Sequence, residues 1–92
     1  MAAETILKNL GLHYTGTYTD DGSFVVDLDG DRDFGKVYSI LDDAESLDYQ
    51  EDNSTLTADN ANLNYIYGED EYLITLMADF ENDHYQLTLT EI

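Results

Sequence analysis

Strict alternation of apolar and polar side chains is the feature that most constrains the fold of this chain. In HYQLTLTE (84–91), the apolar residues Tyr85, Leu87 and Leu89 occupy every second position, and SFVVDLD (23–29) alternates in the same way. Successive side chains of a β-strand point to opposite faces, so this pattern is typical of strands with one buried and one solvated face. Such strands belong mainly to antiparallel sheets, and the sequence therefore predicts one.

Further segments have strand character, and short polar turns connect them. They are residues 12–19, 54–59, 62–68 and 72–80. DDG (20–22) predicts a hairpin turn between 12–19 and 23–29, while GEDE (68–71) and END (81–83) predict two later hairpin turns. These signals predict an antiparallel sheet of about five or six strands, with residues 84–91 leaving a bare edge through which a homodimer could form.

Two segments follow the helical period instead. In 2–12, Ile6 and Leu7 begin an apolar face, and in 33–47 Val37, Ile40 and Leu41 do the same. Asp31 or Asp33 is expected to cap the start of the second helix. No proline and no Gly/Ser-rich linker interrupts the chain. We therefore predict one α+β domain over residues 1–92, with one main helix packed on a face of the sheet and a short N-terminal helix.

The net charge limits the classes of molecule that this protein can bind. The chain has 21 acidic and 3 basic residues, for a formal net charge of −18, yet 42% of its residues are hydrophobic, which favours a folded protein over a disordered one. Such a surface repels nucleic acids and anionic membranes and attracts basic proteins. Cysteine is absent, and the first residues carry no secretory signal. A cytoplasmic protein is expected, and salt should stabilise its fold.

The acidic residues are grouped rather than scattered. Asp27, Asp29, Asp31 and Asp33 occupy alternate positions, which on an extended strand are about 6.6 Å apart on one face. DNA carries one phosphate per 3.4 Å along each strand, so the spacing is of the same order. We expect a second group on the main helix and just beyond it: Asp42, Asp43, Glu45 and Asp48, with Tyr38 and Tyr49 as aromatic anchors.

A calcium site at 27–33 is one alternative interpretation of these carboxylates. An EF-hand loop that began at Asp27 would have Arg32 where glycine is needed and Tyr38 where a bidentate glutamate is needed. The pattern therefore fails at both discriminating positions, and we predict no metal ligands and no cofactor. A less regular calcium-binding module remains an alternative, because hard cations bind clustered carboxylates.

A catalytic interpretation depends on VVDLDGD (25–31), which resembles the first motif of the haloacid-dehalogenase phosphohydrolases. The resemblance implies a nucleophile at Asp27, an acid/base at Asp29 and a nearby magnesium ion. It covers only this short stretch, and the chain is too short for that family's parallel sheet and later motifs. Alternation also predicts a hairpin here. We therefore expect no enzymatic activity and no catalytic residues.

In overall character the chain resembles small acidic phage-encoded inhibitors, among them anti-CRISPR and anti-restriction proteins, which are short, strongly anionic and poor in cysteine. That resemblance implies a viral protein in the host cytoplasm that mimics DNA and binds a basic nucleic-acid-binding protein of the host. Two alternatives stay open. The chain could be an acidic adaptor for a basic partner, or its acidity could be an adaptation to high salt, which would spread acids over every exposed face.

Overall fold

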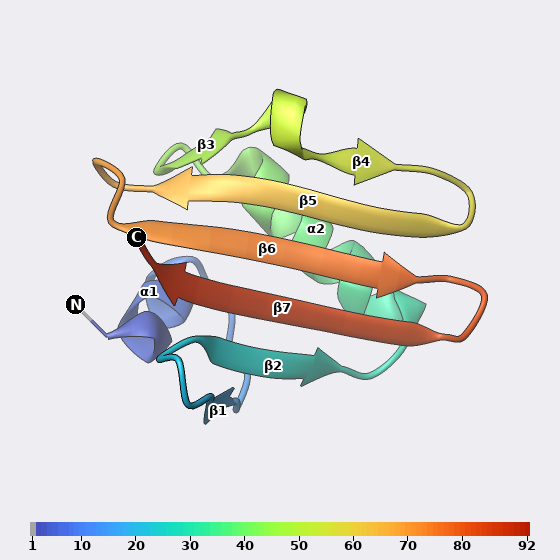
Figure 1. The fold of residues 1–92 in the computed structure, drawn as a ribbon, viewed down its shortest axis with the longest axis horizontal. Helices are drawn as coiled ribbons and strands as arrows, with labels where there is room; N and C mark the ends of the chain where they lie inside the picture. The colour runs from blue at the N-terminus through green and yellow to red at the C-terminus, as the bar shows by residue number, and fades with distance from the viewer. Residues whose placement is uncertain (1) are drawn as a thin grey trace.

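The computed structural model describes residues 2–92, and its central feature is one seven-stranded antiparallel sheet with two α-helices against one face (Figure 1). The predicted α+β class is therefore confirmed. The helices are α1 (Ala3–Asn9) and α2 (Asp31–Asp43), and a 3₁₀ turn, η1, covers Glu51–Asn53. The strands are β1 (Thr17–Tyr18), β2 (Phe24–Leu28), β3 (Leu47–Tyr49), β4 (Thr55–Leu56), β5 (Asn60–Tyr67), β6 (Tyr72–Asp79) and β7 (His84–Glu91).

The order of strands across the sheet is β1-β2-β7-β6-β5-β3, and β4 also pairs with β5. The last three strands form a meander of consecutive hairpins, as their turn sequences predict. The helix α2 connects β2 near one side of the sheet to β3 at the other, and it crosses behind the sheet in Figure 1. The opposite face, which is toward the viewer in Figure 1, has no helix over it.

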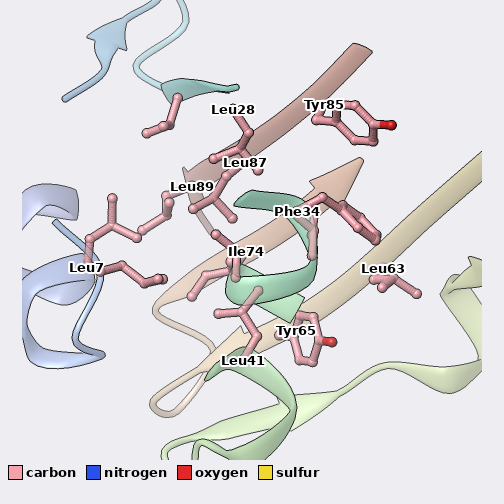
Figure 2. Close-up of a cluster of buried hydrophobic side chains, with 14 of the residues drawn as sticks. Leu7, Leu28, Phe34, Leu41, Leu63, Tyr65, Ile74, Tyr85, Leu87 and Leu89 are labelled. Atoms are coloured by element: carbon pink, nitrogen blue, oxygen red, sulfur yellow. The ribbon is translucent and has the colours of Figure 1, made fainter. Parts of the chain in front are cut away.

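Alternating residues of the strands build the core beneath the helices. Figure 2 shows Leu7 from α1 and Leu41 from α2 directed toward Ile74, Leu87 and Leu89 of the sheet. All five side chains are almost fully buried. The buried positions of β7 are the apolar positions of its alternating pattern, so the sequence predicted which face of this strand is inside.

The first hairpin is present but shorter than predicted. Only Thr17 and Tyr18 of the segment 12–19 pair as a strand with β2, and residues 12–16 run without regular structure. Gly16 lies against β2, where a Cβ atom would come within 2.5 Å of the Val25 carbonyl oxygen and 2.8 Å of the Phe24 ring. Alternation predicted the extended path of this segment, but its length in the sheet depends on contacts with β2.

Residues 84–91 do not form a bare edge, and that prediction is wrong. The strand β7 pairs with β2 on one side and with β6 on the other, so both of its edges are hydrogen-bonded. A homodimer cannot form there by strand pairing. The outermost strands are β1 and β3, and such short strands offer little backbone for pairing with another chain.

The main helix starts earlier and ends earlier than the predicted 33–47. Its N-cap is Gly30, with a φ of 95° that favours glycine, and neither Asp31 nor Asp33 caps it through its side chain. The helix ends at Asp43, where Ala44 turns to extended backbone before β3 begins at Leu47. Within residues 2–92, neither helix has the length and apolarity needed to cross a membrane.

Candidate protein-interaction surface

Carboxylates from two distant parts of the sequence meet at one end of the sheet. The loop from β2 into α2 lies beside the β6–β7 turn, because Leu28 at the end of β2 is the register partner of Tyr85 at the start of β7. We call this region the acidic end, and it comprises Asp27, Asp29, Asp31, Asp33, Asp79, Glu81 and Asp83. Repulsion among so many like charges must be offset by packing between the two segments.

That packing is aromatic. The ring of Phe34, in the first turn of α2, lies 5.5 Å from the ring of Phe80 and 5.8 Å from that of Tyr85, measured between centroids. Phe80 follows directly after β6 in the turn, and Figure 2 shows Phe34 and Tyr85 on neighbouring elements. Aromatic contacts at these separations stabilise a fold beyond the area they bury. The cluster therefore fixes the start of α2 against the β6–β7 turn.

Hydrogen bonds fix the backbone that carries these carboxylates. An Oδ atom of Asp33 accepts a hydrogen bond of 3.3 Å from the backbone N–H of Asp29. In the β6–β7 turn, Asp79 accepts bonds from the Asn82 side chain at 2.7 Å and from its backbone N–H at 3.3 Å. The bonds from Asn82 favour the ionised carboxylate and lower the pKa of Asp79. The acidic end is thus held in a defined backbone conformation.

The negative charge gathered at this end affects the pKa of Tyr85. Burial raises the pKa of its hydroxyl, a hydrogen bond with Asp83 raises it further, and the charges of Asp83, Asp31 and Asp79 act in the same direction. These groups come from α2 and from both sides of the β6–β7 turn, so their fields act on one phenol. Asp31 is among the contact residues predicted from the sequence, whereas Asp79, Glu81 and Asp83, at the end of a predicted strand and in the turn after it, are not.

The ladder at 27–33 is not an extended row, and that part of the prediction is wrong. Asp27 lies in β2, Asp29 lies in the following loop, and Asp31 and Asp33 lie in the first turn of α2. The side chain of Asp27 is on the face without helices, where Gln86 donates a 3.3 Å hydrogen bond to it. Gly30 lies between the strand and the helix, so the four carboxylates do not form one extended row on one face of a strand.

The second predicted group is also divided by the structure. Asp42 and Asp43 lie in the last turn of α2, Glu45 lies in the loop after it, and Asp48 lies in β3. These residues therefore do not share a helical face. In β3, Leu47 packs on the core and Tyr49 contacts Tyr65, so the side chain of Asp48 between them points to the other face of the sheet.

The sides of α2 differ in charge. Asp31, Tyr38 and Asp42 are seven and then four residues apart, so they share one side of the helix, which we call the acidic flank. Asp31 and Asp42 are about 17 Å apart along the axis, at 1.5 Å per residue. Arg32 and Lys36 belong to a different, fully exposed row. Two of the 3 basic residues of the chain therefore lie on the solvent-facing ridge of α2.

The structure brings the two predicted tyrosines, Tyr38 and Tyr49, to a third one. Tyr49 is 44% exposed, and its ring lies 5.2 Å from that of the buried Tyr65. Burial raises the pKa of Tyr65, and the nearby Asp42, Tyr38 and Tyr49 raise it further. We call these four residues the tyrosine cluster. The sequence does not mark Tyr65 as a contact residue, because tyrosine is common in β-strands.

The face of the sheet without helices has a different character. Its central positions, set by the strand register, carry Thr88, Thr75 and Asn64 in one row and Gln86, Met77 and Asn62 in the next. Thr75 donates a 2.7 Å hydrogen bond to the Asn64 side chain across β5 and β6. Acidic residues of the strands also reach this face: Asp27 ends the second row beside Gln86, and strand alternation places Asp48 and Asp79 on the same side. The centre of this face is therefore neutral, and its carboxylates lie toward the margins.

Metal binding and phosphohydrolase chemistry find little support in this arrangement. Among residues 2–92, no three or more His, Cys, Asp or Glu side chains are grouped so that they could hold a metal ion. The strand with Asp27 pairs antiparallel with β7 on one side and with β1 on the other. The haloacid-dehalogenase family places its first motif on a parallel sheet, so the fold contradicts that resemblance.

In comparisons with known proteins, the chain matches no family model, no curated protein and no solved structure.

Proposed function

We propose that this protein is a non-enzymatic inhibitor that occupies the nucleic-acid site of a basic protein, such as a nuclease, a CRISPR effector or a repressor. The observation that carries the proposal is the convergence of residues 27–33 and 79–83 at the acidic end. A groove that binds DNA or RNA is lined with lysine and arginine, which form charge-assisted hydrogen bonds with carboxylates as they do with phosphates.

The distribution of charge supports a directed contact. The acidic end and the acidic flank of α2 are continuous through Asp31, whereas the centre of the face without helices is neutral. An adaptation to high salt alone would place acids at the centre of that face as well. The proposed contact surface therefore comprises the acidic end and the acidic flank, and it leaves out the ridge with Arg32 and Lys36. Asp43, Glu45 and Asp48 lie outside this surface.

The inhibitor acts in the cytoplasm, where such nucleic-acid-binding proteins work, and in the host cytoplasm if a phage encodes it. Its field steers the basic partner toward the acidic end before contact, which makes association fast at low ionic strength. Neither nucleic acid nor a membrane is a direct partner, since both carry the same sign of charge. Inhibition then requires only occupancy of the site, and no bond in the protein or its target changes.

The test begins with a pull-down from bacterial lysate at low and high salt, with and without competing duplex DNA. A purified partner is then tested for loss of DNA binding as the inhibitor is added. We expect a mutually exclusive complex whose affinity falls at least about tenfold between 50 and 200 mM salt, as phosphate contacts do. A partner that binds the protein and DNA together would overturn mimicry and point to an acidic adaptor.

Charge-reversal variants locate the contact. The test variant carries Asp29→Lys, Asp31→Lys and Glu81→Lys at the acidic end. Its matched control carries Asp20→Lys, Glu69→Lys and Glu91→Lys, which are exposed at the opposite end of the sheet. The two variants have equal net charge. We expect only the first to lose inhibition, and equal loss in both would show that net charge alone drives binding.

A further inference from the structure

The hydroxyl of Tyr65 is buried without a hydrogen-bond partner. The residue is 1% exposed. Among the buried side-chain nitrogen and oxygen atoms of residues 2–92, its hydroxyl oxygen is the one without a hydrogen-bond partner. Buried polar groups are nearly always bonded, because leaving one unpaired destabilises the folded state. Phenylalanine would fill the same space without that cost. An unpaired hydroxyl in this position therefore calls for a ligand that supplies its partner.

The surroundings of this hydroxyl suit a cation. Figure 2 shows the oxygen of Tyr65 pointing away from Leu41. The ring of Tyr49 lies 5.2 Å from that of Tyr65, measured between centroids. Burial raises the pKa of the Tyr65 hydroxyl, and the nearby Asp42, at the end of α2, raises it further, as do Tyr38 and Tyr49. A cation over an aromatic face within about 6 Å of the centroid is attracted by the ring quadrupole. The cluster thus offers a carboxylate, aromatic faces and a phenol oxygen together.

Tyr49 can uncover the site at little cost. It belongs to β3, a three-residue strand at the edge of the sheet that pairs only with β5. Its ring is about half exposed and rests on the ring of Tyr65. A short edge strand opens more easily than a central one, because fewer hydrogen bonds and contacts hold it. Movement of this edge strand, with its ring, would give a side chain of a partner a route toward Tyr65.

We propose that the tyrosine cluster receives one arginine side chain of the partner protein, with its guanidinium bound by Asp42 and the Tyr65 hydroxyl and stacked on Tyr49. This inference rests on the proposed function, because a nucleic-acid-binding groove supplies the arginine. The guanidinium N–H groups donate to the carboxylate and to the phenol oxygen, which gains its missing partner. Aromatic residues in desolvated pockets are the usual centres of binding energy at interfaces.

Arginine fits this site better than lysine does. Its planar guanidinium presents several donors in a fixed fork, stacks on aromatic faces and is more weakly hydrated than an ammonium group. Lysine is a compact, strongly hydrated charge that would have to lose more of its hydration to reach a buried oxygen. The acidic end attracts either residue through its field. The tyrosine cluster therefore adds selectivity to a surface that otherwise attracts any cation.

The test uses Nα-acetyl-arginine amide as the probe and needs no partner protein. The chain is labelled with ¹³C in its tyrosine rings and titrated with this probe and with Nα-acetyl-lysine amide. We expect saturable shifts of the Tyr49 and Tyr65 ring signals with the arginine probe, and weaker binding of the lysine probe. Tyr65→Phe should lower the affinity for the arginine probe about tenfold, as loss of a hydrogen bond to a charged group does.

Controls separate binding from folding. Tyr65→Phe should raise the thermal midpoint by about 4–8 °C, because it removes an unpaired buried hydroxyl. Asp42→Asn should also weaken the arginine probe, whereas Asp43→Asn, the same change on the exposed ridge, should not. Equal binding of the two probes would overturn the inference. Unchanged affinity in Tyr65→Phe would overturn it as well.

The two proposals can fail separately. If the arginine probe binds as expected and no nucleic-acid-binding partner is inhibited, the arginine site stands and the proposed function fails. If a partner loses its DNA in the presence of the protein and Tyr65→Phe inhibits it as well as the unaltered chain does, the arginine site alone is wrong.

Discussion

The ring of Phe34 packs edge-on against the ring of Phe80, with centroids 5.5 Å apart and the ring planes at 89°. Phe34 lies in the first turn of α2, and Phe80 begins the β6–β7 turn, so this contact joins two segments that carry the carboxylates of the acidic end. A second contact at 6.1 Å joins Phe80 to Tyr85. The geometry of the proposed contact surface therefore depends on an apolar pair that carries no charge itself.

Phe80→Ala is expected to destabilise the protein by about 2 kcal/mol. The same substitution of a fully buried phenylalanine costs about 3–5 kcal/mol, and Phe80 is only half-buried. Urea unfolding followed by circular dichroism measures this change. Met77→Ala is the control, since Met77 is 41% exposed on the face without helices, and its effect should stay within about 0.5 kcal/mol. Similar effects of the two substitutions would show that the aromatic cluster does not hold the β6–β7 turn.

Two glycines should respond to alanine in opposite directions. At Gly16 a new Cβ would meet the Val25 carbonyl oxygen, which is backbone and cannot give way, so Gly16→Ala should cost about 1–3 kcal/mol. At Gly35, inside α2, a Cβ meets nothing within 4 Å, so Gly35→Ala should stabilise by about 0.5–1 kcal/mol. Thermal unfolding of the two variants side by side measures both. A stabilising Gly16→Ala would contradict the close approach of residues 12–16 to β2.

Alkaline pH should destabilise the protein through its buried tyrosines. Burial raises the pKa of Tyr65 above the ordinary value near 10, and it raises that of Tyr85 as well. Above about pH 10 the unfolded chain loses protons that the folded chain keeps, so the stability present below pH 10 is lost as the pH rises through this window. Unfolding in urea between about pH 9 and 12 measures the decline.

Tyr65→Phe makes that decline shallower, by up to about 1.4 kcal/mol per pH unit, since one titrating group is removed. At neutral pH the same variant should be about 1 kcal/mol more stable. An unchanged slope in Tyr65→Phe would place its hydroxyl in contact with water.

Salt should stabilise the fold. With a formal net charge of −18, like charges repel throughout the folded state, and raising ionic strength from about 0.01 to 0.15 M shortens the Debye length from about 30 to 8 Å. We expect the thermal midpoint to rise by several degrees with sodium chloride. Micromolar calcium chloride should add nothing to this effect. A specific rise with calcium would instead restore the calcium-binding alternative.

Alternating patterns and turn chemistry were sufficient to predict the sheet. The buried positions of β2 and β7 are those that the sequence marks as apolar, and the meander follows from short polar turns. Strand order was harder to predict because pairing is set by contacts between distant segments. The side chains of β7 alternate because one face of the strand is buried and the other faces solvent. This pattern does not show whether neighbouring strands pair with it, and in the structure both of its backbone edges are paired.

The sequence by itself determined how much charge this protein carries, which residues carry it and which side chains are buried. Only the tertiary structure decided which charges are neighbours. Gly30 ends the ladder by starting a helix, and the pairing of β2 with β7 brings residues 79–83 to the start of α2. The reason is physical: local propensity acts over a few residues, whereas the position of a carboxylate on the surface depends on long-range packing beneath it.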